Sequence, residues 1–305
     1  METIAIAPLL AASINAGTPL LLAALGLLIN EKSGVVNLGA EGMMLVAAVT
    51  GFATAVSSGS VALGFAVGAG AGMLLAALFA LFAVWIGTNQ YATGLALALF
   101  GGGASAYIGI DFSGHSLASS TFVLPVLSDL PVVGVALFRH HPTVYLSLLL
   151  CAAIVWFLYR SRAGLVLRAV GESPHSAHAL GYNVRLIRTG ALLFGGACCG
   201  LAGAYLSLVY TPLWVEGMVA GRGWIALALT TFATWRPVRV LAGAYLFGGV
   251  TILSFHAQAL GVAIASQLLS MLPYLATILV LVLISRNPDW IRLNMPASLG
   301  KPFQP

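Results

Sequence analysis

Charged residues are scarce in this sequence. Asp, Glu, Lys and Arg make up 7% of its 305 residues, whereas about 25% is usual in a soluble domain. Hydrophobic residues make up 60%, and the mean hydropathy is +1.01. These values exclude an ordinary soluble domain, which needs a polar surface. About 20 residues cross the hydrocarbon core, so we expect one all-α, polytopic membrane domain over residues 1–305, with roughly eight to ten transmembrane helices, including broken or re-entrant segments.

Lysine is almost absent, and its absence excludes one kind of ATPase. The chain has only Lys32 and Lys301, and neither stands in a Gly-Lys-Ser/Thr sequence. A P-loop needs that sequence to hold phosphates, so this chain cannot hydrolyse ATP by that route. His-Glu-x-x-His, Gly-x-Ser-x-Gly and paired carboxylates in the apolar runs are also missing, which disfavours an intramembrane enzyme. A transporter or channel remains.

Metal and disulfide signatures are missing as well. All three cysteines lie in apolar runs, without disulfide or metal-ligand spacing. A polar segment at about 111–142 contains three histidines, again without ligand spacing, and we expect these to be solvated. We therefore expect no metal site and no cofactor in this chain.

Positive charge is concentrated near the middle of the chain. The segment at about 160–188 holds five of the thirteen Lys and Arg residues, and membrane-length apolar runs flank it. The positive-inside rule assigns this loop to the cytoplasm. The segment 111–142 and the N-terminus are then external, because no Lys or Arg precedes Lys32, and the C-terminus is internal. Without a basic patch and interleaved aromatics, the net charge of +5 implies no nucleic-acid partner.

The central loop contains the signals of a short helix. Ser173 is a suitable N-cap, Pro174 fits the first helical position and Gly181 stands just past the end. A helix of about seven residues is too short to be stable alone in water. We expect a partner protein in the cytoplasm to hold it.

A glycine-rich stretch after the first apolar run carries an amide and a carboxylate, Asn37 and Glu41. An acidic side chain in a membrane span is costly and needs compensation. Two readings are open. In one, a broken or re-entrant helix turns Asn37 and Glu41 toward an aqueous path. In the other, Asn37 caps a helix start and Glu41 interacts with the positive end of the dipole near the headgroups.

Two further segments suggest irregular helices. Asn89, Gln90 and Thr93 form a second polar cluster, for which we favour simple interhelical or interfacial hydrogen bonds over contact with a translocated solute. The apolar run 223–235 is too short for a comfortable span, which suggests a half-helix.

Four stretches together resemble a known family. They are Gly-Val-Val-Asn-Leu-Gly-Ala-Glu-Gly-Met-Met-Leu at 34–45, Asn-Gln-Tyr-Ala-Thr-Gly-Leu-Ala-Leu at 89–97, Gly-Glu-Ser-Pro at 171–174 with Gly-Tyr-Asn-Val at 181–184, and the segment 216–228 beginning Glu-Gly-Met. The set resembles the permease subunits of bacterial ABC importers, in particular the nucleoside and simple-sugar type related to ribose and branched-chain amino-acid permeases.

The resemblance implies partners and a location. It implies a multi-pass protein of the bacterial inner membrane, surrounded by lipid and paired with a second permease chain that is homologous but different. An ATP-binding subunit would bind ATP and Mg, and an external substrate-binding lipoprotein would deliver the solute. By the same resemblance, the short helix would be the coupling segment that docks into the ATP-binding subunit. Its expected contact residues are Glu172, Ser173, Pro174, His175, His178 and Gly181.

The expected solute is neutral and polar, because no Lys or Arg lies inside an apolar run to hold a carboxylate. The resemblance favours a nucleoside over a simple sugar such as ribose, and both over an amino acid. A secondary transporter is the less favoured alternative, since it would need paired intramembrane carboxylates and Glu41 stands alone. The candidate path residues are Asn37, Glu41, Asn89, Gln90, Thr93, Tyr205 and Trp224.

Overall fold

The computed structural model describes residues 2–118, 134, 137–259, 268, 271, 272, 275, 276, 278, 279, 282 and 294–304. Within this part the fold is all-helical, as predicted. The first half comprises α1 (Glu2–Lys32), α2 (Ala40–Ser58), α3 (Val61–Ala80) with the π-helical turn η1 (Leu81–Ile86), and α4 (Gln90–Gly109) with the short 3₁₀ turn η2 (Ile110–Phe112). The second half comprises α6 (Pro142–Arg160), α7 (Arg162–Glu172), α8 (Pro174–Ala179), α9 (Val184–Tyr205) with the π-helical turn η4 (Leu206–Tyr210), α10 (Arg222–Phe232) and α11 (Pro237–Ala259).

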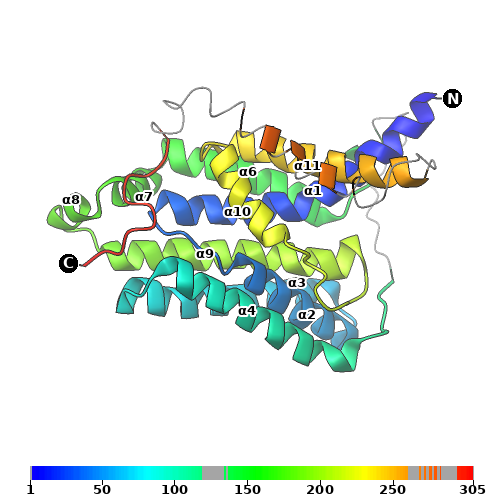
Figure 1. Cartoon of the computed structure of the whole chain (residues 1–305), viewed down its shortest axis with the longest axis horizontal. Helices are drawn as coiled ribbons and strands as arrows, with labels where there is room; N and C mark the ends of the chain where they lie inside the picture. The colour runs from blue at the N-terminus through cyan, green and yellow to red at the C-terminus, as the bar shows by residue number, and fades with distance from the viewer. Residues whose placement is uncertain are drawn as a thin grey trace.

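Seven of the described helices are long and apolar enough to cross a membrane. They lie roughly along one direction, which places the N-terminus at one end of the bundle and α7, α8 and the C-terminus at the other (Figure 1). The second end is the cytoplasmic one by the positive-inside rule, because it carries the arginines of the central loop. The chain is therefore a multi-pass membrane protein, and the short helix of the central loop lies at the end of the bundle opposite the N-terminus.

Two predicted segments fall largely outside the described residues. The apolar run 264–284, which belongs to the expected count of eight to ten spans, is described at only a few scattered positions. The external segment 111–142 is described only at 111–118, at 134 and from 137 onward. The structure therefore does not test their helices.

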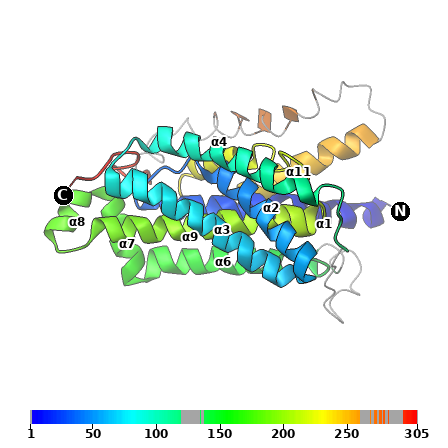
Figure 2. The same cartoon turned by 90° about the horizontal axis from the view of Figure 1, so that it is seen from below.

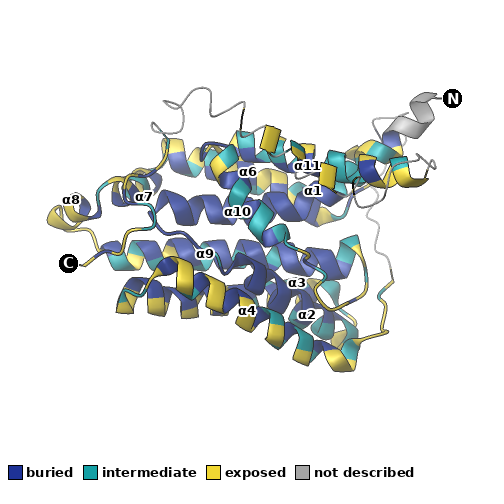
Figure 3. Ribbon diagram, in the orientation of Figure 1, coloured by how far each residue is buried: buried dark blue, intermediate teal, exposed yellow. Residues whose placement is uncertain are grey.

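The core is formed by α1 and α9, which are the most buried of the long helices (Figure 3). In α1 the leucines between Leu20 and Leu28 are almost fully buried. By contrast, α4 and α6 lie on opposite sides of the bundle and expose large apolar side chains, such as Leu99 and Leu149 (Figure 2). Exposed apolar surface on a membrane helix suits contact with lipid or with another membrane subunit.

Small residues allow the closest helix packing. The most extensive helix pair in the described part is α3 with α9. A Cβ added at Gly72 would lie 2.2 Å from the carbonyl oxygen of Gly196 and 2.8 Å from the Cα of Gly200. Backbone therefore meets backbone at this crossing, a typical way to gain packing energy in a bilayer, where the hydrophobic effect contributes little between helices.

This crossing generates a prediction with a control on the same helix. Gly72→Ala should lower the free energy of unfolding by about 1–3 kcal/mol, because the methyl group overpacks a backbone contact. At Gly70 an added Cβ meets nothing within 4 Å, so Gly70→Ala should be neutral or stabilising by up to about 1 kcal/mol. Thermal unfolding of both variants in one detergent measures the difference. Equal stability of the two variants would contradict the packing argument.

Candidate functional site

The short helix α10 is the irregular feature around which the candidate site is built. Its 11 residues span about 16 Å, roughly half of the ~30 Å hydrocarbon core. It crosses the middle of the bundle obliquely (Figure 1). Its N-cap, Gly221, adopts the left-handed region with φ 81°, and no side chain of its own sequence caps it. The first N–H groups of α10 therefore need acceptors from elsewhere. The half-helix predicted for 223–235 is thus present.

Glu41, from the first turn of α2, supplies those acceptors. The backbone N–H of Gly221 donates to its Oε1 at 2.8 Å, and that of Gly223 donates to its Oε2 at 2.7 Å. The backbone N–H of Trp224 also interacts with this carboxylate. A Cβ at Gly223 would lie 2.6 Å from the Cα of Glu41, so glycine is what lets the two helix starts approach. Glu41 thus lies in the first turn of its own helix, as one reading required, and its carboxylate also meets the positive end of α10.

Asn37 shapes the chain between α1 and α2. Its side chain is fully buried, and its Oδ1 accepts the backbone N–H of Gly39 at 3.0 Å. In the same segment the backbone N–H of Val36 donates to Oε1 of Gln90 at 2.9 Å. Non-helical backbone is tolerated inside a membrane protein only where such partners satisfy it. Residues 33–39 therefore form a buried return segment that delivers Glu41 to α10.

A second glutamate holds the other end of α10, and sequence reasoning missed it. Glu31, at the inner end of α1, is 2% exposed. Its Oε2 accepts the hydroxyl of Thr230 at 2.8 Å and the indole N–H of Trp235. Thr234 and Trp235 have φ values of 49° and 51°, a region that a β-branched residue rarely adopts. The sequence showed only a Glu-Lys pair at a helix end, and no local pattern linked it to Trp235.

The predicted path residues do not form one cluster. Glu41 and Trp224 meet at the start of α10, whereas Asn37 lies in the return segment and Gln90 binds that segment. Asn89 accepts two backbone N–H groups as the N-cap of α4, and Thr93 shares a 2.8 Å hydrogen bond with Thr88. The bonds of Asn89 and Thr93 are therefore local to the start of α4. Tyr205 lies apart from it and donates its hydroxyl to Oδ1 of Asn15 at 3.1 Å.

The short helix predicted in the central loop is present as α8. The hydroxyl of Ser173 accepts the backbone N–H of Ser176 at 3.3 Å, Pro174 starts the helix, and Gly181 follows it with φ 89°. Glu172, His175 and His178 are exposed at the cytoplasmic end.

The C-terminal tail is a further element that sequence reasoning did not single out. Arg188, counted among the loop charges, is in fact 2% exposed, on α9. Its guanidinium donates to the carbonyl of Lys301 at 3.2 Å and to the hydroxyl of Ser298 at 3.1 Å. The backbone N–H of Ser298 in turn donates to the carbonyl of Gly171 at 3.0 Å. The tail, residues 294–304, is thereby fixed across the cytoplasmic end of the bundle.

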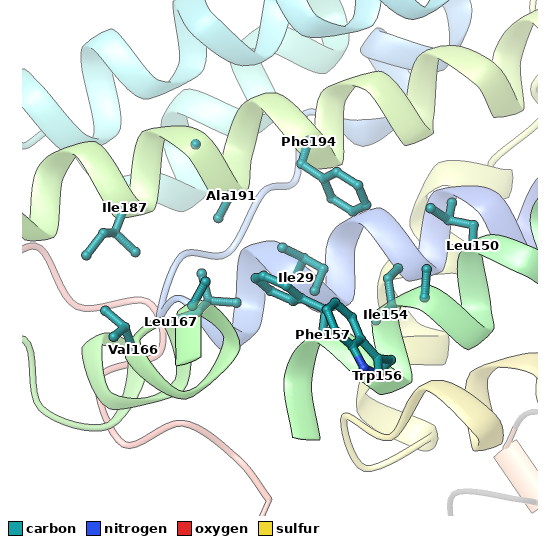
Figure 4. Close-up of a pocket in the computed structure, with 13 residues that line it drawn as sticks. Ile29, Leu150, Ile154, Trp156, Phe157, Val166, Leu167, Ile187, Ala191 and Phe194 are labelled. Atoms are coloured by element: carbon teal, nitrogen blue, oxygen red, sulfur yellow. The ribbon is translucent and has the colours of Figure 1, made fainter. Parts of the chain in front are cut away.

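The apolar cavity beside α6 and the metal-binding groups do not offer a second site for a polar solute. A cavity of about 620 Å³ lies between α1, α6, α7 and α9, with walls formed by apolar side chains such as Ile29, Phe157 and Phe194 (Figure 4). It lacks the hydrogen-bonding groups that would orient a polar solute. Among the described residues, no group of three His, Cys, Asp or Glu side chains is placed to hold a metal ion.

Comparison with known proteins places this architecture among transporters. Residues 9–284 match the family described as branched-chain amino acid transport system / permease component. A putative glucose ABC transporter permease protein of Haloferax volcanii is 42% identical over 316 aligned residues, covering 96% of each chain. A nucleoside ABC transporter permease of Lactococcus lactis is 31% identical over 280 residues, covering 87% of this chain and 88% of that one. A guanosine ABC transporter permease of Bacillus subtilis is 29% identical over 306 residues, covering 95% and 96%. No solved structure matches.

The capping contact predicts different effects for two changes at one position. Glu41→Leu leaves the buried N–H groups of Gly221 and Gly223 without acceptors, so stability should fall by about 1–3 kcal/mol for each group that water does not reach. Glu41→Gln keeps one carbonyl oxygen as an acceptor and should therefore lose less stability than Glu41→Leu. Thermal unfolding of the purified variants tests the order wild type, Gln, Leu.

The control for this series is Glu216→Leu, which removes an exposed carboxylate of the neighbouring loop. It should change stability by no more than about 0.5 kcal/mol. If Glu41→Leu is no more harmful than Glu216→Leu, the carboxylate does not hold α10.

Proposed function

The chain belongs to the family of branched-chain amino acid transport system permease components, and from this premise we propose that it is the permease subunit of an ATP-driven importer, with α10 lining the solute path. The observation that carries the proposal is the Glu41 contact with the start of α10. A helix that begins at membrane depth is expected where irregular backbone lines a cavity or path.

The exposed face of α10 indicates where the path runs. The helix packs on α1, α2 and α11, while Trp224, Ala228 and Thr231, at helical spacing, remain partly or fully exposed. Figure 3 shows this intermediate exposure in front of the buried core. The described part of the chain leaves this face partly uncovered, so we propose that a second, homologous permease chain covers it and that the path lies between the two. We expect this second permease chain to belong to the same family and to differ in sequence from the present chain.

The path residues fall into two roles in this proposal. Trp224 offers a ring face for a sugar or base on the exposed side of α10. Asn37, Glu41 and Gln90 hold the broken backbone that positions it. Asn89, Thr93 and Tyr205 contribute through helix capping and interhelical bonds.

The proposed solute is neutral and rich in hydroxyl groups. Relatives described as glucose and nucleoside permeases support this class. Both solutes present a sugar ring, and neither carries a carboxylate. The glucose permease is more similar to this chain (42% identical) than the nucleoside permeases are (31% and 29%), which supports a simple sugar as the solute. Two nucleoside permeases support a nucleoside, the class favoured by the sequence resemblance.

Permeases of this family imply an ATP-binding subunit and a substrate-binding protein. We propose that ATP and Mg bind in the former and that α8 transmits its motion. The experiment that tests the permease role is purification of the tagged chain after expression with its neighbouring genes. Recovery of a stoichiometric ATP-binding subunit is the expected result. Uptake by the chain alone, driven by a proton or sodium gradient, would reject the proposal in favour of a secondary transporter.

Substrate class is tested by uptake into vesicles that contain the whole reconstituted importer. Radiolabelled glucose, ribose, guanosine, uridine and leucine are compared in parallel. We expect ATP-dependent uptake of a sugar or a nucleoside and none of leucine, because the described path residues offer no cation aimed at a carboxylate. Uptake of leucine alone would overturn the solute class and leave the permease assignment intact.

The coupling role of α8 predicts the effect of changing Gly181. An added Cβ there meets nothing within 4 Å, but φ is 89°, so Gly181→Val strains only the backbone, by about 1–2 kcal/mol. We expect weaker recruitment of the ATP-binding subunit and less ATP hydrolysis stimulated by solute. Gly190→Val is the control, since that Cβ also meets nothing within 4 Å and the residue lies inside α9. Equal ATPase activity in the two variants would contradict the role.

A further inference from the structure

The helix α8 is supported from within the chain, although the sequence suggested support from a partner. The rings of His175 and His178 lie 5.3 and 5.7 Å from the ring of Phe303, measured between centroids. Phe303 is 6% exposed and packs with Val170 and Ala177. The tail that carries it is fixed by the Arg188 bonds described above. The C-terminal tail therefore sets the position of α8.

A cavity of about 360 Å³ opens beside Phe303 at the cytoplasmic end. We call it the inner-face pocket, and its lining includes Trp85, His178, Tyr182, Arg185 and Phe303. Four of these five side chains are rings. They come from the end of α3, the α8 segment, α9 and the tail, so the pocket forms only when all four are in place.

Arg185 gives the pocket a positive charge that stacks on Trp85 and for which the described residues provide no acceptor at Nε. Its guanidinium carbon lies 5.8 Å from the centroid of the Trp85 ring. Its Nε is buried and has no hydrogen-bond partner among the described residues. A buried donor without an acceptor costs free energy, and a carboxylate would satisfy it with a strong bond.

We propose that the inner-face pocket receives a segment of the ATP-binding subunit, with an apolar side chain between the rings and a neighbouring carboxylate on Arg185. This rests on the proposed function. Two observations select this occupant. The pocket adjoins α8, where Leu180 and Tyr182 are 78% and 43% exposed, and its charge calls for an acidic partner. The ATP-binding subunit thus contacts α8 and the C-terminal tail together, so the tail contributes to coupling.

The test compares two charge reversals on the cytoplasmic end of the chain. Arg185→Glu should weaken binding of the co-purifying ATP-binding subunit by about tenfold or more, because it places like charges in a desolvated contact. Arg162→Glu, an exposed charge of α7 outside the pocket, should weaken it by less than about threefold. Arg185→Gln is an uncharged second variant for the case that Arg185→Glu does not fold. Affinity is measured with the full chain in nanodiscs of neutral lipid and again with anionic lipid.

Crosslinking identifies the occupant. The native cysteines are buried, so a thiol-reactive photo-crosslinker can be attached to a Tyr182→Cys chain at the new thiol, and on illumination it should bond to the ATP-binding subunit. Mass spectrometry should locate the bond beside an acidic residue, and reversing that residue to Arg should restore binding to Arg185→Glu.

The other outcomes overturn the proposal in distinguishable ways. If Arg185→Glu and Arg162→Glu lose affinity for the ATP-binding subunit equally, or if Tyr182→Cys gives no crosslink, the pocket is not a docking site and the permease assignment stands. A loss seen only with anionic lipid assigns the pocket to a lipid headgroup. If the wild-type chain recruits no ATP-binding subunit at all, the proposed function itself fails.

Discussion

The structure depends on one set of hydrogen bonds, in which the carboxylate of Glu41 accepts the first N–H groups of α10. Each partner alone would be costly in a membrane protein, since a helix that starts at depth has orphan donors and a buried carboxylate lacks solvent. Together they allow the chain to interrupt its helical pattern inside the bundle. The return segment 33–39 brings Glu41 to this point, and Gly223 lets it approach. Broken helices in transporters require this kind of compensation.

The opposite end of α10 is held just as specifically. Glu31 binds Thr230 and Trp235 where the backbone takes two unusual conformations in succession. The half-helix is therefore tied at both ends to α1 and α2. A contact at each end is a suitable arrangement for an element that responds to movement of its neighbours. Lys32, the residue after Glu31, donates to the carbonyl of Asn294 in the tail at 2.7 Å. The end of α1 therefore connects the inner end of α10 directly to the tail.

The cytoplasmic face is assembled from segments distant in the sequence. Arg188 of α9 binds the tail, the tail binds Gly171 of α7, and Phe303 supports α8. A six-residue helix gains rigidity from such packing, which its own hydrogen bonds cannot provide. Motion of an ATP-binding subunit at α8 would thus reach α7, α9 and the return segment through direct contacts.

The sequence by itself determined the membrane class and the caps of α8, because composition and capping residues are local properties. It also located the half-helix, from a run too short to span. Only the tertiary structure decided which helix Glu41 caps, that Glu31 matters, that Arg188 is buried, and that Phe303 supports α8. Gly221 and Glu41 are 180 residues apart, and no periodicity connects them. Such pairs form only in the folded chain, because packing brings distant segments together and buried donors need acceptors nearby.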